Sequence, residues 1–384
     1  MMSFLGYERP DGQVGLRNHV GVISVMDNCN PVTRAVANAV EGALPVTTLF
    51  VRGQLGRDLD IAYDTLAGLA RNPNIAAIVL IGLEPVTTEE VASRIRSCGK
   101  PLEIVNIQLV GGTIEATALG VRHAARLMRE ASRQKRTNQP LTKLTIGVEC
   151  GGSDTTSGLA SNPSIGFAAD QVVAGGGKVV ISETSEFFGA EHLFAERAET
   201  EAVGQQFLDA VLGFEEEVMA RGLDLRGANP SKDNIRGGLT TIEEKALGAM
   251  SKAGTSPLVG VLKYGEAPMK AGLHFMATPA PAVESLTGLA AGGCQLILFS
   301  TGVGNPIGSV VATTLKVSGN RNTVATFSDN IDFDVSDVIE NGSPIREAGG
   351  RLFDFTLEVA SGALTSSEVL DVRETAISRF EPSM

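Results

Sequence analysis

Acidic and imidazole side chains gather after the apolar run 178–182. Glu183, Glu186, Glu191 and His192 lie within ten residues of one another. Carboxylate oxygens and imidazole nitrogens are ligands for divalent transition metals. The same segment also fits a capped helix with a solvated acidic face, because Thr and Ser cap helices whose first turn favours Glu. We favour the metal interpretation, because His192 is the one histidine of four that lies among acids.

A second group is the glycine-rich segment 148–158, VECGGSDTTSG. Its glycines allow backbone N–H groups to approach an anion closely, and its hydroxyl groups add neutral donors. It lacks the Gly-Lys-Ser/Thr ending of a phosphate-binding loop, and no GxGxxG motif follows the first expected strand. A simple turn would explain the glycines but not the run of polar residues, so we expect substrate binding here. The residues concerned are Gly151, Gly152, Ser153, Asp154 and Thr155, directly after Cys150.

Four further residues could carry chemistry in the sequence. Cys29 and Asn30 follow the apolar run 19–26, where they could bind a ligand or simply form a helix cap beside a small buried thiol. Arg17, in GYERPDGQVGLRN, is a candidate clamp for a substrate anion. Lys263 ends an expected strand, and a lysine there is either a salt-bridge partner or, if buried, a base or a carboxylate clamp.

Strands and helices must position these residues, and they alternate along the first third of the chain. Apolar, β-branched runs predict strands, and stretches with apolar residues at helical spacing predict helices. This rhythm favours right-handed crossovers and a parallel sheet. The expected strands are 19–26, 45–51, 75–82 and 101–107, and the expected helices are 31–42, 58–70, 87–99 and 113–133.

The polar, basic segment 133–143 is the best linker, because it has no apolar periodicity. Beyond it we expect strands at 144–150, 178–183, 257–265 and 294–301, with helices at 164–174, 188–221, 240–253 and 366–378. The fold class is therefore α/β, with two or three parallel-sheet units packed around a shared crevice. The expected domains are 1–135, 143–235 and 236–384.

Composition excludes several classes of protein. The 384 residues carry a formal charge of −12 and no Lys/Arg-rich run, which argues against a nucleic-acid partner. No apolar stretch approaches the ~18–20 residues of a membrane helix, and the N-terminus has no signal-peptide pattern, so we expect a cytoplasmic protein without a membrane partner. Four widely spaced cysteines are typical of reduced thiols.

Five motifs together resemble the large catalytic portion of the altronate/galactarate dehydratase family, which includes the sulfolactate sulfo-lyase large subunit. The resemblance runs from about residue 6 to past 330. The motifs are GYERPDGQVGLRN, ECGGSDTTSGLASNPSIG, ISETSEFFGAEH, GGLTTIEEKALG and LILFSTGVGNPIG.

The resemblance implies a lyase in which Fe²⁺, or Mn²⁺, assists β-elimination from a 2-hydroxy carboxylate to give a 2-keto acid. We expect Cys29, Cys150, Glu183, Glu186 and His192 around the metal. The proton acceptor is expected to be His192, Glu191 or a residue of a partner. Lys263, also expected to be catalytic, contacts the substrate anions together with Arg17 and the loop 151–157. The chain begins at the GYERPDG motif, so we expect a separate small SAF-type subunit, and the family implies an oligomer. The leaving group stays open between water and sulfite. A noncatalytic ligand-binding subunit and a metal-free oxidoreductase are the alternatives.

Overall fold

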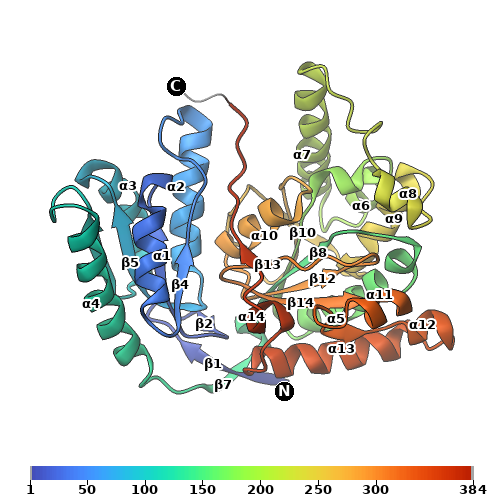
Figure 1. Cartoon of the computed structure of the whole chain (residues 1–384). Helices are drawn as coiled ribbons and strands as arrows, with labels where there is room; N and C mark the ends of the chain where they lie inside the picture. The colour runs from blue at the N-terminus through green and yellow to red at the C-terminus, as the bar shows by residue number, and fades with distance from the viewer. Residues whose placement is uncertain (1, 382–384) are drawn as a thin grey trace.

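The computed structural model describes residues 2–381, which form two lobes (Figure 1). The first lobe is built on a parallel sheet with strand order β4-β3-β5-β6. Strand β5 (Ile75–Gly82) is buried along its whole length, as an apolar strand covered on both faces must be. The other strands are β3 (His19–Ser24), β4 (Ala43–Val46) and β6 (Leu102–Asn106).

Four helices cover this sheet. Helix α1 (Asn30–Asn38) packs against α4 (Thr113–Ala131), and α2 (Gly56–Arg71) packs against α3 (Pro85–Ile95). Helix α3 starts after Glu84, whose carboxylate accepts the N–H groups of Val86 and Thr87 and so satisfies donors that the helix leaves open. Helix α2 also packs against the second lobe. This contact forms part of the interface between the two lobes.

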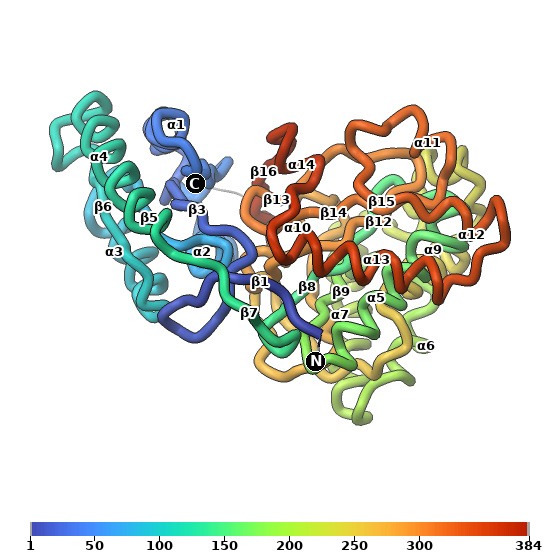
Figure 2. Tube along the Cα trace, turned by 90° about the horizontal axis from the view of Figure 1, so that it is seen from below, coloured from blue at the N-terminus to red at the C-terminus, as the bar shows by residue number. Residues whose placement is uncertain are grey.

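The lobes are joined by a short antiparallel sheet at their base (Figure 2). The segment expected as a linker contains β7 (Thr137–Pro140), which pairs with β1 (Ser3–Glu8); β1 also pairs with β2 (Val14–Gly15). The linker is therefore partly ordered by the N-terminal strand, a non-local pairing that the local sequence pattern does not reveal.

The second lobe contains a seven-stranded parallel sheet with the order β10-β11-β9-β8-β12-β14-β15. It combines strands from both ranges expected as the central and the C-terminal domain. The strands are β8 (Thr145–Cys150), β9 (Lys178–Ile181), β10 (Leu258–Leu262), β11 (Gly272–Met276), β12 (Leu296–Ser300), β14 (Thr313–Ser318) and β15 (Phe333–Asp334). The predicted α/β class is confirmed.

Helices flank this sheet as well. Helix α5 packs against α13, and α10 packs against α2 of the first lobe and against β8. The helices are α5 (Asn162–Ala174), α6 (Glu191–Ala195), α7 (Glu201–Ala220), α8 (Lys232–Arg236), α9 (Ile242–Met250), α10 (Ala282–Ala291), α11 (Arg321–Thr326), α12 (Asp337–Glu340), α13 (Ile345–Ala360) and α14 (Ser366–Val369). No helix within residues 2–381 has the length and apolar character to cross a bilayer.

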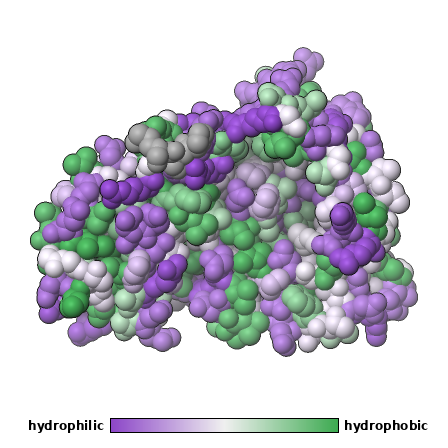
Figure 3. Space-filling view, turned by 45° about the horizontal axis from the view of Figure 1, so that its top comes forward, coloured by the Kyte–Doolittle hydropathy of each residue, from purple (hydrophilic) through white to green (hydrophobic). Residues whose placement is uncertain are grey.

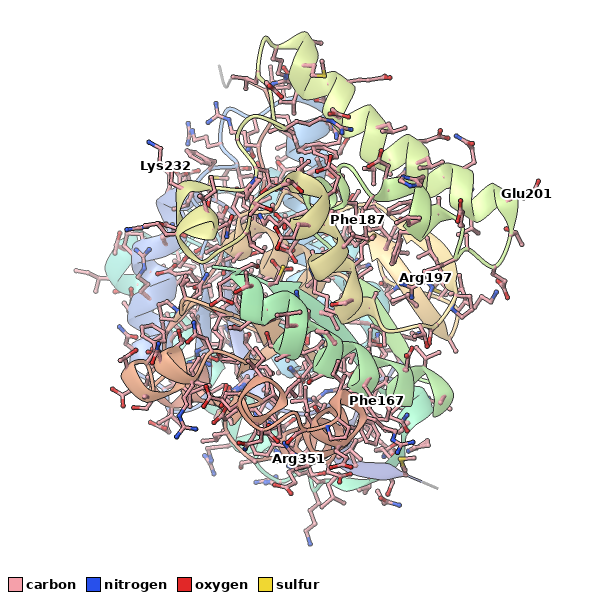
Figure 4. All side chains as sticks on the ribbon, turned by 90° about the vertical axis from the view of Figure 1, so that its right-hand side faces the viewer. Phe167, Phe187, Arg197, Glu201, Lys232 and Arg351 are labelled. Atoms are coloured by element: carbon pink, nitrogen blue, oxygen red, sulfur yellow. The ribbon has the colours of Figure 1, made fainter. Side chains whose placement is uncertain are left out.

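A cluster of phenylalanine rings fixes the segment that follows β9. The Phe187 ring centroid lies 5.3 Å from that of Phe275 on β11 and 4.9 Å from that of Phe194 on α6, and Phe207 of α7 completes the group. Figure 4 places Phe187 inside the lobe beside α7. Edge-to-face ring pairs contribute ~0.5–1.5 kcal/mol each beyond their area burial. This cluster therefore anchors the turn that carries several of the acidic candidates.

Two expectations for the elements are wrong. The C-terminal helix expected at 366–378 ends after one turn, because the chain then pairs as β16 (Arg373–Glu374) with β13 (Gly308–Ser309). The strand expected at 45–51 is β4, displaced toward the N-terminus, and residues beyond Val46 form a loop. Both differences come from pairing with distant partners.

Candidate active site

The loops that carry the candidate residues meet at the point in the second-lobe sheet where the strand order reverses. From β8 the chain continues to β9 on one side, whereas β12 lies on the other side of β8. Loops that follow neighbouring strands diverge at such a point and leave a crevice at the carboxyl ends of the strands. The crevice here lies between the glycine loop after β8 and the loop after β12.

A cavity of about 530 Å³ occupies this position, and we call it the switch-point pocket. Segments following β8, β9, β11 and β12 contribute to its walls, together with the segment 225–234 and α9. The lining residues are Cys150, Gly151, Gly152, Ser153, Glu183, Ser185, Glu186, Leu225, Ala228, Asn229, Ser231, Asp233, Asn234, Lys245, Ala280, Pro281, Val303 and Gly304.

A buried ion pair holds one residue of the pocket wall, Glu183. Lys252 Nζ lies 2.8 Å from Glu183 Oε2 and 3.2 Å from Cys150 Sγ. Burial alone would lower the pKa of Lys252, but the Glu183 carboxylate, which accepts its hydrogen bond, opposes this and the pKa lies above its ordinary value. Burial raises the pKa of Glu183, and the Lys252 ammonium opposes this shift. Burial also raises the pKa of Cys150, which favours the neutral thiol.

A second buried carboxyl group, Glu149, lies behind this pair. One of its oxygens accepts hydrogen bonds from Ser182 and Ser285, both at 2.7 Å, and the other has no hydrogen-bond partner. Burial raises its pKa well above the ordinary value, and Glu183 adds to the shift. Glu149 is therefore stabilised as the neutral acid.

The pocket lining also contains a cation and a carboxylate oxygen without a hydrogen-bond partner. Lys245 Nζ lies 2.8 Å from Glu186 Oε1 and also donates to the Asn229 side chain. Both members of the Lys245–Glu186 pair are largely buried, with 11% and 6% of their side chains exposed. Glu186 Oε2 is buried without a hydrogen-bond partner. An orphaned oxygen of this kind is costly, so its presence in a pocket wall points to function.

Backbone conformation shapes the pocket at two positions. Gly152 has φ +69°, which favours glycine, and its carbonyl oxygen accepts the N–H groups of Gly302 and Val303. Glu183 also has a positive φ, +72°, although it carries a side chain. Such strain persists where the surroundings enforce it, and here Lys252 and the Cys150 N–H hold the carboxylate.

The predicted substrate-binding loop lies at the pocket, but only some of its residues line the pocket. Gly151, Gly152 and Ser153 line the switch-point pocket. Asp154 is buried and braces the loop, because its carboxylate accepts hydrogen bonds from Ser157 and Asn320. Thr155 lines two neighbouring cavities.

Arg17 and Asn30 instead have structural partners away from this pocket. Arg17 forms a bidentate ion pair with Glu368 and donates to the carbonyl oxygens of Val359 and Ala363. The Asn30 side-chain amide exchanges hydrogen bonds with the Thr48 backbone. Their donors are used, which leaves them unsuited to the substrate role that the sequence suggested.

The predicted catalytic residues also lie outside the switch-point pocket. His192 is exposed on α6, and Glu191 accepts the Gly189 N–H at 2.6 Å. Lys263 lines a cleft of about 1000 Å³ between α2 and α7, on the hollowed face in Figure 3. These three residues follow strand ends in sequence, but the turns and helices in which they lie carry them to other surfaces.

The five predicted metal ligands do not assemble. Cys29 is fully buried in the apolar core of the first lobe, and His192 is exposed. Cys150, Glu183 and Glu186 share the switch-point pocket, but lysines already hold both carboxylates. Across residues 2–381 no three His, Cys, Asp or Glu side chains are placed to hold a metal ion. These residues therefore do not fit the divalent metal that the resemblance implies, and a metal requirement stays a prediction.

Sequence reasoning missed the two lysines of the site. Lys245 and Lys252 lie on and just after α9, in a stretch expected only as a helix. The available signal was the position of Lys252 among Ala249, Met250 and Ala253, all buried, because a lysine on the apolar face of a helix requires a buried partner.

Comparison with known proteins identifies the family. A family model described as D-galactarate/Altronate dehydratase, C-terminal, matches residues 141–383. The chain belongs to this family. A second model, D-galactarate dehydratase/Altronate hydrolase, second domain, matches residues 6–132. The resemblance drawn from the five motifs is thereby confirmed, and the chain is a lyase of the galactarate/altronate dehydratase family.

Relatives within the family cover nearly the whole chain. The (2R)-sulfolactate sulfo-lyase subunit beta of Chromohalobacter salexigens is 40% identical over 99% of this chain and 98% of its own length. The altronate dehydratase of Escherichia coli is 32% identical over 97% of this chain and 76% of its own length. The galactarate dehydratase (L-threo-forming) of Escherichia coli is 30% identical over 94% and 73% respectively.

Proposed function

We propose that this family member catalyses β-elimination from a 2-hydroxy carboxylate in the switch-point pocket. The observation that carries the proposal is the pairing of a largely buried cation, Lys245, with an unpartnered carboxylate oxygen, Glu186 Oε2, in one cavity. Elimination needs both, because a base must remove the C2 proton and positive charge must stabilise the carboxylate as charge develops on it.

The proposed steps use groups of this chain. Lys245 and the N–H groups of Gly152 and Ser153 bind the substrate carboxylate, and Glu186 Oε2 accepts the C2 proton. The C2–H electron pair forms the C2=C3 double bond, and the leaving group departs from C3 with its bonding electrons. The resulting enol takes up a proton at C3 and loses the proton of its C2 hydroxyl group, which gives the 2-keto acid.

We favour sulfite as the leaving group and a sulfonated 2-hydroxy acid as the substrate. The support is the higher identity to the sulfo-lyase subunit, over nearly the full length of both chains. Water as the leaving group, from a sugar acid, is the second candidate, supported by the altronate and galactarate dehydratases. Because the sulfo-lyase relative is named as a subunit, we also propose a companion subunit, of SAF type, for this chain.

The test is a product assay on the purified chain, with and without the co-expressed companion and with Fe²⁺ or Mn²⁺ supplied anaerobically. Sulfolactate, altronate and galactarate are offered separately. Semicarbazide reports 2-keto acid, and Ellman's reagent reports sulfite. Sulfite and 2-keto acid in equal amounts from sulfolactate support the first candidate, and 2-keto acid from the sugar acids alone supports the second. Binding of these acids without any product would favour a noncatalytic subunit and contradict the proposal.

Substitutions of Glu186 and Lys245, compared with matched control substitutions, test the roles proposed for these two residues. Glu186→Gln and Lys245→Met should lower the rate, each by about 100-fold or more, as expected for loss of a general base or of charge stabilisation. The controls are Glu201→Gln and Lys135→Met, because both side chains are exposed and neither residue lines the pocket. Figure 4 shows Glu201 pointing away from the molecule. Equal rates in the site variants and the controls would remove the switch-point pocket from consideration.

A further inference from the structure

Lys316 is a buried lysine whose ammonium group lies beside the proposed active site. It is on β14, with no exposed surface, and its ammonium group donates to the carbonyl oxygens of Pro306 and Ile307. No carboxylate lies within ion-pair distance of its Nζ among residues 2–381. Burying an ammonium group without a counter-ion is expensive, and an apolar side chain of similar length would avoid that cost.

The contacts of Lys316 lead directly to the glycine loop. Its Nζ lies 4.5 Å from the centre of the Phe299 ring on β12. A Cβ atom added to Gly151 would lie only 2.8 Å from Cζ of that ring, so the ring packs immediately beneath the glycine loop. Phe299 is thus fixed between the ammonium group and the pocket wall.

The segment that Lys316 holds also forms part of the pocket wall. Val303 and Gly304 line the pocket, a few residues before the two carbonyl groups that Lys316 binds. The N–H groups of Gly302 and Val303 donate to the Gly152 carbonyl oxygen at 3.0 and 2.9 Å, so the loop after β12 is bonded to the glycine loop.

We propose that Lys316 is a positioning residue for the elimination: it holds the loop 301–307 and, through Phe299, the glycine loop in the geometry that binds the substrate carboxylate. The inference rests on the proposed function. Lys316 does not line the pocket, so it acts through these loops and not by contact with substrate.

The experiment compares Lys316→Met with Lys100→Met. Lys100 is a matched control, because it is also a buried lysine bound only to backbone carbonyl oxygens, those of Ala70, Arg71 and Asn72, but in the first lobe. Hydrogen exchange of peptides covering 150–156 and 300–308 measures loop order without any substrate. Steady-state kinetics uses the hydroxy acid that the wild-type enzyme, with its companion, turns over.

We expect Lys316→Met to speed exchange in both peptides and to lower kcat/KM by about 100-fold, mainly through KM, because misplacement by ~1 Å has effects of that size. Lys100→Met should change neither. Lys316→Arg, which keeps the cation, should recover part of the loss. If Lys316→Met does not fold, Phe299→Leu tests the same contact from the other side.

Two results would overturn the inference. Unchanged exchange in both peptides would show that Lys316 does not order the loops, whatever the activity. Faster exchange with unchanged KM and kcat would show that these loops do not set the geometry of the site. If the wild-type enzyme turns over no hydroxy acid, the proposed function fails, and the exchange measurement still decides whether Lys316 orders the loops.

Discussion

Lys252 Nζ lies 2.8 Å from Glu183 Oε2, and both side chains are almost completely buried, with 0% and 2% exposed. The pair joins the segment after α9 to the turn after β9, which places Glu183 at the pocket wall in a conformation with positive φ. A buried ion pair of this kind stabilises a fold only when both partners are present.

Removing one partner of this pair should therefore destabilise the protein strongly. Lys252→Met leaves the Glu183 carboxylate buried without a counter-ion, and we expect a loss of ~3–5 kcal/mol in the free energy of unfolding. Urea denaturation measures it. The double variant Lys252→Met/Glu183→Gln should recover part of the loss, because it removes the unpaired charge; a double variant as unstable as the sum of the single ones would contradict this account.

The Arg17–Glu368 pair predicts a dependence of stability on pH. Burial raises the pKa of Glu368, but the Arg17 guanidinium outweighs it, so the pKa lies below its ordinary value of 4.5. A carboxyl group whose folded pKa is lowered contributes stability above its unfolded pKa and loses it as the pH falls through the folded pKa. The wild-type protein should therefore lose this contribution below about pH 4.5.

The matching variant is Glu368→Gln, followed by urea denaturation from pH 7 to pH 3. Its unfolding free energy should be lower than that of the wild-type protein at pH 7, and the difference should shrink in the acid. A difference that stays constant over this range would mean that Glu368 does not titrate as the ion pair requires.

The Gly302 backbone, in the loop after β12, lies so close to Asp154 that we can predict the effect of adding a methyl group at Gly302. A Cβ atom on Gly302 would lie 2.2 Å from the Asp154 carboxylate, which is held by Asn320 and Ser157. Gly302→Ala should thus destabilise by ~1–3 kcal/mol and weaken substrate binding. Gly350→Ala, on α13 with open space around it, is the control and should stabilise by ~0.5–1 kcal/mol. Thermal unfolding of both variants decides the comparison.

The family resemblance predicts that a divalent metal is required, although the predicted ligand set does not assemble within this chain. Dialysis against a chelator should abolish the elimination by the enzyme with its companion, and Fe²⁺ or Mn²⁺ should restore it. Metal analysis of the isolated chain should find less metal than in the complex, because the predicted ligands do not assemble within residues 2–381. Full activity after complete removal of the metal would contradict the requirement.

Local patterns were sufficient for the elements that carry their own signal. The buried run of β5 and the helical spacing of α2 and α4 predicted those elements closely, because each depends on its own apolar residues. The strands β7 and β16 did not follow from the local pattern. Strand β7 forms by pairing with β1, and β16 forms by pairing with β13.

The same difference applies to the site. Cys150 ends β8, and Glu183 and Glu186 follow the neighbouring strand β9. The rule that polar residues at the ends of neighbouring strands converge therefore placed the three in one pocket. Lys245 and Lys252 come from a helix that reaches the pocket only through the tertiary fold, and Cys29 follows a strand of the other sheet. Residues that follow strand ends could be predicted to lie close together only when their strands belong to the same sheet.

The central claim is that Glu186 removes the C2 proton in the switch-point pocket, and the release of deuterium from a substrate labelled at C2 tests it most directly. The wild-type enzyme and Glu201→Gln should release one deuterium to water for each 2-keto acid formed. Glu186→Gln should release it at least ~100-fold more slowly while still binding the substrate. Release by Glu186→Gln at the wild-type rate would contradict the claim.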